Sequence, residues 1–600
     1  MNRNVESHFA LTPSSLDMKR SVFDKSFKLL TTFNAGKLIP IYCEPDVLPG
    51  DTFNLDFGAL VRMTPNVHPT MDNCYLDVFF FFVPNRIVWP HWKEFCGENS
   101  SGFWIPSTEY TVPYLSVPGN SPYGGFEQGS VADYMGLPTK KKGIRVNQLP
   151  FRAYVSIFNE WFRDQNVQTP AGNNLTDSNN NYLGIDQSYV TSAYRGGQLC
   201  PVNKYHDYFT SLLPGVQKGP DVALPISQPL APIHSDVFTA SDLGIRAPTT
   251  ISSLSYDSAT QTYTPINANI GQVGGSYVVP FEDYSNPPLY VGMNYDLTTN
   301  TNQSVTSKLP WNIGSLSKGT DGSMMFDLDH FYADLSNIGT TISDLRTSFQ
   351  IQKFYEKRAL YGSRYTEIVR SFFGVTSPDG RLQRPEYLGG ARIPINISQV
   401  VQTSSTDATS PQANVAAYSL TTARDKGFRY SATEHGIFLG LCCVRQEHSY
   451  QQGIPRGFLR RTVFDYYWPT FSAISNQPVY NQQIYTQGSG VTDADGNIID
   501  NQVLGFSEAW ADYRFANTSN VTGQFRSNAT GTLDSWHYAD NYASLPTLSS
   551  DFIQETDVNI NRTLAVSSSV ADQFIANFYF NIQAYRVMPV YSVPGLVDHF

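Results

Sequence analysis

The hydrophobic positions of this chain alternate with polar ones over many short stretches, which is the two-residue period of β-strands. These stretches predict strands at 51–63, 74–85, 392–401, 436–445 and 573–590. The second stretch contains four consecutive phenylalanines, Phe79 to Phe82, which a strand presents on both of its faces. We therefore expect one face of that strand in the core of a β-sandwich and the other beneath a second layer. The run is too short to span a membrane, and Asp77 and Pro84 interrupt it.

Two stretches follow the helical period instead. Apolar residues recur at spacings of three and four in 151–165 and again in 340–360, so we predict helices there. Gly362 separates the second helix from a further helical stretch at 363–375. A short helix is also expected after a cap at Ser14 or Ser15, with one apolar side made of Phe23, Phe27 and Leu30.

The predicted strands lie far apart in the sequence yet must share a core. That arrangement is typical of Greek keys and jelly rolls with loop insertions, and it predicts a mainly β, antiparallel fold with a few helices. The expected parts are an N-terminal arm (1–40), a first part of the sandwich with a helical insertion (41–215), a surface insertion (216–321), the remainder of the sandwich (322–590) and a C-terminal tail (591–600).

The amino-acid composition indicates that much of the surface is buried in contacts with partners. Aromatic residues make up 14% of the chain and charged residues only 16%, against about 25% charged in typical globular proteins. The net charge of −11 argues against a chain that coats nucleic acid with its whole surface, although a local basic patch is compatible with it. The N-terminus has no apolar signal region, and no stretch predicts membrane insertion. The six cysteines form no CxxC pair and are expected to be free thiols.

Four histidines lie next to acidic residues, which raises the question of catalysis. They are His206, His435, His448 and His537. Adjacency in sequence does not bring side chains together, so we expect these histidines to hydrogen-bond within loops and the chain not to be an enzyme. The stretch 492–500 resembles part of a calcium loop, but its glycine is misplaced and a turn is the better interpretation. No cofactor or metal is expected.

Basic residues beside aromatic ones are the more informative feature. Arginines near aromatic rings suit single-stranded nucleic acid, and they suit ion pairs at an interface equally well, so both interpretations stay open. The lysine run at 140–142 is interpreted as a solvated turn. The candidate DNA contacts are Lys19, Arg20, Lys25, Lys28, Arg445, Arg456, Arg460 and Arg461.

Several long segments closely resemble the major capsid protein of gokushovirus-type microviruses, which are small phages with circular single-stranded DNA. They include "HFALTPSSLDMKRSVFD", "MDNCYLDVFFFFVPNRIVW", "NQLPFRAYVSIFNEWFRDQN", "HSYQQGIPRGFLRRTVFDYYWP" and the ending "MPVYSVPGLVDHF". The resemblance implies an eight-stranded jelly roll, a T=1 icosahedral shell around the DNA, a small basic internal protein and protrusions at the three-fold axes. The alternative from another class is a carbohydrate-binding or carbohydrate-cleaving β-protein.

As a coat subunit, the chain is expected in the virion, and in the host bacterial cytoplasm during assembly. Its expected partners are copies of itself, packaged DNA, the internal protein and a bacterial surface receptor. Residues 216–321 carry eight acidic and four basic residues, so we expect them to face outward and to serve host attachment. Aromatic residues near the two chain ends are candidate subunit contacts: Phe9, Phe23, Phe27, Phe33, Tyr591 and Phe600.

Overall fold

The chain divides into two compact units, one formed by 1–219 with 355–600 and the other by 220–354. The computed structural model describes residues 20–98, 108–117, 124–173, 175–177, 195–220, 342–362, 364–376, 378–401, 415–515 and 520–591, a few single positions, and short strands between 183 and 334. Each unit is considered by itself below.

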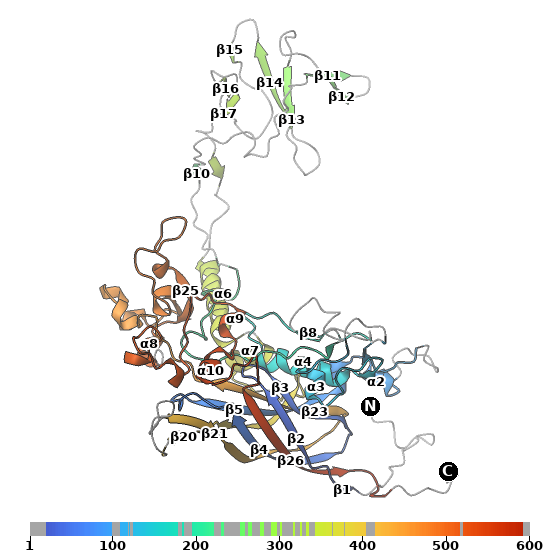
Figure 1. The fold of residues 1–600 in the computed structure, drawn as a ribbon. Coiled ribbons are helices and arrows are strands. Elements are labelled where there is room, and N and C mark those ends of the chain that lie inside the picture. The colour runs from blue at the N-terminus through green and yellow to red at the C-terminus, as the bar shows by residue number, and fades with distance from the viewer. Residues whose placement is uncertain are drawn as a thin grey trace, which may run out of the picture. The chain divides into compact units, whose positions relative to one another are not determined.

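Two antiparallel sheets form the centre of the larger unit (Figure 1). In the first, β26 lies between β4 and the edge strands β1 and β2, and β4 pairs with β22 on its other side. In the second, the order is β19-β5-β23-β3. Their bounds are β1 Ser21–Asp24, β2 Phe27–Phe33, β3 Ile39–Val47, β4 Thr52–Met63, β5 Cys74–Pro84, β19 Glu386–Pro394, β22 Thr421–Ser431, β23 Gly436–Gln446 and β26 Phe574–Arg586. We call them the β26 sheet and the β5 sheet.

The phenylalanine run supplies both faces of the β5 sheet, as the sequence predicted. Phe80 and Phe82 are buried in the core between the two sheets. The ring of Phe80 lies 5.6 Å from that of Phe57 in β4, which joins the sheets directly. Phe81 points the other way and is buried in a second core. The strand is therefore covered on both sides.

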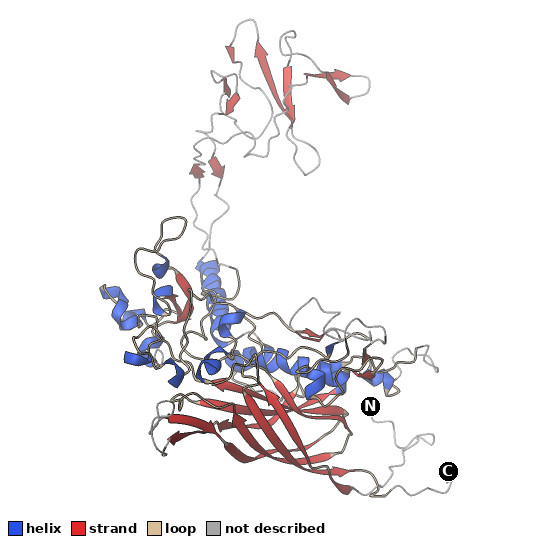
Figure 2. Ribbon diagram, viewed as in Figure 1, coloured by secondary structure: helices blue, strands red, loops and turns tan. Residues whose placement is uncertain are grey.

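A layer of helices and loops forms that second core on the outer face of the β5 sheet (Figure 2). Its centre is α4 (Leu149–Ile157), which continues as the π-helical turn η1 (Phe158–Phe162). Tyr154 of α4 donates a hydrogen bond to the carbonyl oxygen of Leu38 at 2.8 Å, fixing the helix against the sheet. The prediction of a helix at 151–165 is confirmed.

The remaining helices and turns are short, apart from α6 and α7. The α-helices are α1 Asn85–Val88, α2 Trp92–Phe95, α3 Val131–Tyr134, α6 Ile342–Tyr361, α7 Tyr365–Phe373, α8 Ala511–Arg514, α9 Ser550–Ile553 and α10 Val558–Thr563. The 3₁₀ turns are η2 Arg456–Leu459, η3 Val463–Asp465, η4 Pro469–Phe471, η5 Asn481–Gln483, η6 Ile499–Asn501, η7 Gly523–Phe525 and η8 Asp534–Trp536. Helices α6 and α7 confirm the two predictions made around Gly362.

Further strands form small antiparallel pairs and a three-stranded sheet. In the larger unit they are β6 Tyr114–Ser116, β7 Arg145–Asn147, β8 Gly172–Asn173, β9 Leu183–Gly184, β20 Ile397–Val401, β21 Val415–Ser419, β24 Asn476–Tyr480 and β25 Val503–Glu508. In the smaller unit they are β10 Leu230–Pro232, β11 Ser253–Asp257, β12 Thr262–Ile266, β13 Ser276–Pro280, β14 Tyr290–Asp296, β15 Thr301–Asn302, β16 Leu316–Lys318, β17 Met324–Phe326 and β18 Tyr332–Asp334. The side chains of the expected outward insertion lie largely outside the described residues.

The mainly β prediction is confirmed, and two local predictions are corrected. Phe23, Phe27 and Leu30 lie in β1 and β2, so the expected helical side is wrong. In β1 and β2 the backbone of these residues pairs with β26, whereas a short isolated helix is only marginally stable in water. The strand expected at 392–401 is broken between β19 and β20. Among the described residues, no helix has the length and apolar character needed to cross a bilayer.

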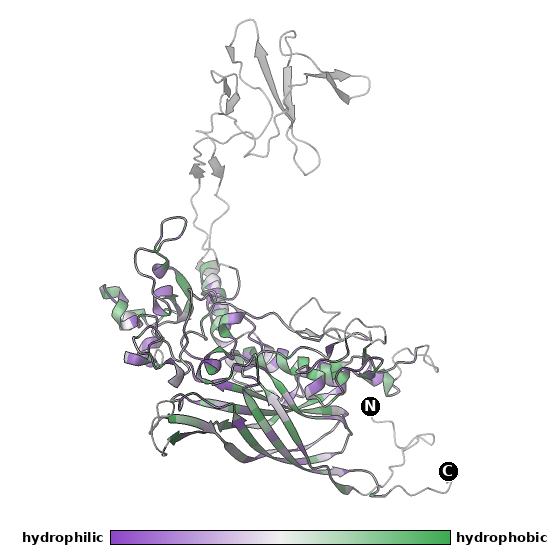
Figure 3. Cartoon of the chain, viewed as in Figure 1, coloured by the Kyte–Doolittle hydropathy of each residue, from purple (hydrophilic) through white to green (hydrophobic). Residues whose placement is uncertain are grey.

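Within the part of the chain that the structure describes, no helix covers the outer face of the β26 sheet (Figure 2). Along β26 the inward side chains are buried while the outward ones are exposed or half-buried. Figure 3 shows the resulting mixture of hydrophobic and hydrophilic positions along these strands. We call this outer surface the open face of the β26 sheet.

Candidate assembly interface

A dense group of exposed apolar side chains lies between η2 and β24. All ten residues from 461 to 470, "RTVFDYYWPT", are exposed. Phe458 and Phe464 are 84% and 74% exposed, whereas phenylalanine side chains are usually buried in folded proteins. We call the exposed apolar residues of this segment, with two from α8 and the position after it, the aromatic ledge: Phe458, Val463, Phe464, Tyr466, Tyr467, Trp468, Ile474, Tyr513 and Phe515.

Polar contacts hold the ledge in a defined conformation. The indole nitrogen of Trp468 donates to the carbonyl oxygen of Val463 at 3.0 Å. Asp465 accepts from the backbone amide of Thr462 at 2.6 Å and caps η3, and these bonds lower the pKa of its carboxyl group. The exposed rings are therefore displayed on a pre-formed surface, and little conformational entropy remains to be lost when a partner binds.

Arg460 connects the ledge to α8. Its guanidinium forms an ion pair with Asp512 and lies 4.3 Å from the ring centre of Tyr513. It also donates from Nε to the backbone oxygen of Asp465 at 3.0 Å. One arginine thus satisfies three groups from two segments, and the interface-type ion pair considered from the sequence is formed within the chain.

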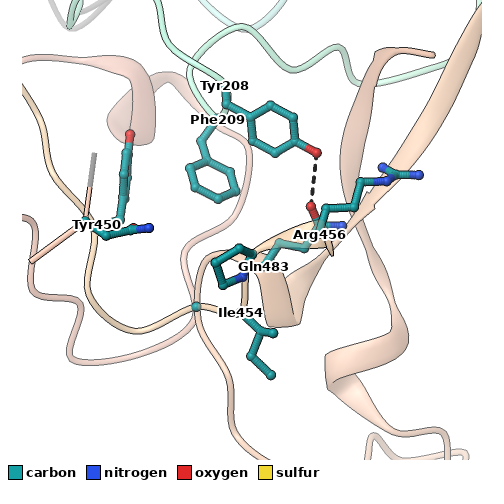
Figure 4. Close-up of a pocket in the computed structure, with 9 residues that line it drawn as sticks. Tyr208, Phe209, Tyr450, Ile454, Arg456 and Gln483 are labelled. Carbon is teal, nitrogen blue, oxygen red and sulfur yellow. Dashed lines mark hydrogen bonds between the residues drawn. The ribbon is translucent and has the colours of Figure 1, made fainter. Parts of the chain in front are cut away.

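A small pocket lies where the chain enters the ledge (Figure 4). The hydroxyl of Tyr208 donates to Oε1 of Gln483 at 3.0 Å across it, and burial raises the pKa of Tyr208. Arg456, on its rim, donates to the backbone oxygen of Pro478 at 3.0 Å. These contacts join η2 to β24, and they fix the position of the segment in which the ledge begins.

The candidate DNA contacts are dispersed over the chain. Arg445 pairs with Asp77 in the β5 sheet, and Lys25 pairs with Glu44. Arg461 is exposed on the ledge, while Arg20 and Lys28 are exposed at the β26 sheet. Lys19 lies outside the described residues. The seven described candidates are not brought to one surface, and the role of all eight in DNA contact stays a prediction.

The candidate subunit contacts near the chain ends also differ in environment. Phe33 is buried in the core of the chain itself. Phe27 is 38% exposed and stacks on Phe580, and Phe23 is half-buried in β1. Tyr591 is 80% exposed. Phe9 and Phe600 lie outside the described residues.

Two of the histidine-containing stretches meet in the folded chain. The Nδ1 atom of His448 lies 3.1 Å from both carboxylate oxygens of Asp540, and its Nε2 atom lies 3.0 Å from Glu555. Lys204 contacts the same Asp540 at 3.1 Å. All four side chains are at most 7% exposed, so a substrate has no access to them.

The other three histidines lie in separate surroundings. His537 contacts the carbonyl oxygen of Phe525 at 2.6 Å, His435 packs edge-on against Trp92, and His206 is exposed. Among the described residues no group of three or more His, Cys, Asp or Glu side chains is arranged to hold a metal ion.

A β-sandwich covered on one side by helices, with a rigid and exposed aromatic surface, defines a class of structural proteins that associate through their surfaces. The family model described as capsid protein (F protein) matches residues 13–596, and the chain belongs to this family. It is 40% identical to capsid protein VP1 of Chlamydia phage 1 over 99% of this chain and 98% of the relative.

Two further capsid proteins named VP1 are similar over nearly their whole length. The one from Spiroplasma virus 4 is 37% identical, over 96% of this chain and 95% of the relative. The one from Bdellovibrio phage phiMH2K is 35% identical, over 100% and 99%. The resemblance to gokushovirus-type capsid proteins is confirmed. Family membership indicates a structural, non-enzymatic virion component that self-assembles into a capsid, and it does not favour the carbohydrate alternative.

The aromatic ledge was not singled out from the sequence. The signal was present in "RTVFDYYWPTF", where aromatic residues follow one another without strand or helix periodicity. Such a run fits neither face of a regular element, so its rings must either be exposed or lie beneath another segment.

Proposed function

We propose that this chain is the major coat subunit of a T=1 icosahedral shell that encloses a circular single-stranded DNA genome. The two central sheets are proposed to form an eight-stranded jelly roll, with β1 and β2 acting as one bent edge strand. The observation that carries assembly is the aromatic ledge, because rigid rings exposed over such a length are stabilised when a second copy covers them.

Each ledge phenylalanine that becomes buried contributes about 2 kcal/mol, and a closed shell repeats that contact in every subunit. The terminal segments that carry Phe9, Phe23, Phe27, Tyr591 and Phe600 are proposed to add contacts between subunits. Host attachment is assigned to an outward position of 216–321, in line with its acidic excess. A small basic internal protein is proposed to neutralise part of the genome, since the chain itself is acidic.

The proposal is tested with the double variant Phe458→Asp and Phe464→Asp, expressed as the full chain. We expect folded subunits with unchanged circular dichroism and no shells in negative-stain electron microscopy. The carboxylates would have to be desolvated in the contact, which opposes assembly strongly.

The matched control is Val558→Asp with Val570→Asp, which places the same two charges at positions 65% and 79% exposed outside the ledge. This variant should form shells as the original chain does. Normal shells from the double variant of the ledge would refute the role of the ledge, and a wild-type chain that never forms shells would refute the coat function.

A further inference from the structure

The open face of the β26 sheet carries several exposed cations. Lys28, Arg62, Arg424, Lys426 and Arg429 are exposed, and the register of their strands places all five on this face. Within the described residues, none of these side chains forms an ion pair. Elsewhere in the larger unit, arginines such as Arg445 and Arg460 have carboxylate partners.

Few acidic groups offset this charge. The strands of the sheet present Asp24 and Asp56 on the same face, and Asp425 pairs in register with the buried Phe57 and so belongs to the opposite side. Asp572 adds a third carboxylate at the end of the face, where it accepts from the outward-facing Thr32. Five cations against three carboxylates give a local positive excess in a chain whose net charge is −11. A surface of this kind attracts an anionic partner.

One row across the sheet combines charge with an accessible ring. Tyr579 of β26 is 54% exposed, and its register partners are Lys28 on one side and Gly58 on the other. Gly58 is in turn the partner of Arg424. Because Gly58 has no side chain, one flank of the tyrosine ring is open to a flat group. Strands lie about 4.8 Å apart, so the two cations stand about 14 Å apart across the row.

We propose that the open face binds single-stranded nucleic acid, with a base stacked on Tyr579 and flanking phosphates contacted by Lys28 and Arg424. This deepens the proposed function and rests on it, because a coat subunit that encloses single-stranded DNA needs a surface that accepts bases and phosphates together. Rings that stack bases between cations are the general solution for binding without sequence preference. Arg62, Lys426 and Arg429 extend the phosphate contacts along the sheet.

The test measures binding of the purified full-length chain to a fluorescent single-stranded oligonucleotide by anisotropy at several salt concentrations. Lys28→Gln with Arg424→Gln should weaken binding and reduce the slope of log K against log salt by about 1.4, since each phosphate contact on a single strand contributes about 0.7. Tyr579→Ala should weaken binding roughly five- to hundredfold, and Tyr579→Phe should keep the original affinity.

Matched controls separate this face from general charge. Lys140→Gln with Lys141→Gln removes two exposed lysines outside the sheet and should leave the slope unchanged. An abasic strand should bind the original chain and Tyr579→Ala equally, because it has no base to stack. Polyglutamate should compete only weakly, and competition as strong as that of the oligonucleotide would assign the face to an acidic polypeptide.

The proposal is overturned if the double charge variant keeps both its affinity and its salt slope, or if Tyr579→Ala binds the oligonucleotide as the original chain does. Binding is measured on unassembled subunits, so its failure is distinguishable from failure of the coat function. Shells that form and retain DNA while these variants bind normally would leave the coat function standing and remove the assignment of this face.

Discussion

The buried cluster around His448 predicts how the stability of the subunit depends on pH. Burial disfavours a charged imidazole, but the carboxylates of Glu555 and Asp540 on either side outweigh it and raise the pKa of His448 from 6.5 to about 9. Burial also opposes ionisation of Asp540, yet the charges of His448 and Lys204 hold the pKa of that carboxyl well below its usual range. His448 is therefore protonated in the folded chain at neutral pH.

The sign of the effect follows from the raised pKa. A proton bound more tightly in the folded state stabilises the fold fully below the unfolded pKa of 6.5, and this contribution is lost as pH rises toward about 9. The shift corresponds to about 3 kcal/mol, lost at roughly 1.4 kcal/mol per pH unit. Asp540 changes ionisation only in acid, and the lowered pKa of His537 affects stability only below its ordinary range, so neither group interferes above pH 6.5. Burial raises the pKa of the thiols of Cys43, Cys74, Cys200, Cys442 and Cys443. Because these thiols ionise more readily in the unfolded chain, they lower stability as pH approaches 9, and the measurement therefore ends at pH 8.

The assay is urea denaturation of dissociated subunits between pH 6.5 and 8, followed by tryptophan fluorescence. The free energy of unfolding should fall by about 1.5 kcal/mol in the original chain over this range. His448→Gln should be less stable at pH 6.5 and nearly independent of pH, because glutamine carries no titrating proton. His206→Gln, which changes an exposed histidine, should retain the original slope. Parallel curves for the original chain and His448→Gln would refute the reasoning.

Two further predictions concern the β5 sheet. Asp77→Asn should lower the free energy of unfolding by about 3 kcal/mol. Asp77 accepts from Arg445 and Arg392, and without its carboxylate the half-buried guanidinium of Arg445 has lost its ion-pair partner. A change below about 1 kcal/mol in urea denaturation would contradict this. Phe81→Ala should cost about 3–5 kcal/mol by the same measurement, since Phe81 packs under the helical layer, whereas the exposed Ile575→Ala should cost under about 1 kcal/mol. Equal losses at the two positions would show that the helical layer does not depend on Phe81.

Much of the fold was predictable because period and burial are local properties. Side chains alternate between the two faces of β5, so its run of phenylalanines required both faces to be covered. The adjacent Cys442 and Cys443 alternate in the same way and lie in the two different cores. The N-terminal segment was mispredicted because its apolar spacing fits a helix, whereas β26, more than 500 residues away, supplies the pairing that makes it a strand. Strand pairing over such a distance leaves no local signal.

The surfaces were harder to predict than the core. Charged residues were grouped by proximity in sequence, but Arg445 turns inward to Asp77 while Arg460 turns to Asp512. Conversely, Lys28, Arg62 and Arg424 come from three separate strands and meet only through the register of the β26 sheet. Which cations share a face is fixed by topology, and topology was known only at the level of the family resemblance.

The two exposed surfaces differ in the chemistry that each can accept. On the aromatic ledge the half-buried Arg460 is already paired with Asp512, and the exposed rings outnumber the exposed cation Arg461, so covering the ledge with protein desolvates mainly apolar area. The open face of the β26 sheet has exposed cations that form no ion pair among the described residues, beside polar side chains such as Asn577 and apolar ones such as Leu30 and Ile575. Covering this face with a protein surface that lacks acidic groups would desolvate the cations without forming ion pairs in exchange. Phosphate groups offset the cost of desolvating the cations by forming ion pairs with them, and water remains between these contacts. A chain that must bind both its own copies and a polyanion therefore gains from keeping these surfaces chemically distinct, because each one then disfavours the partner of the other.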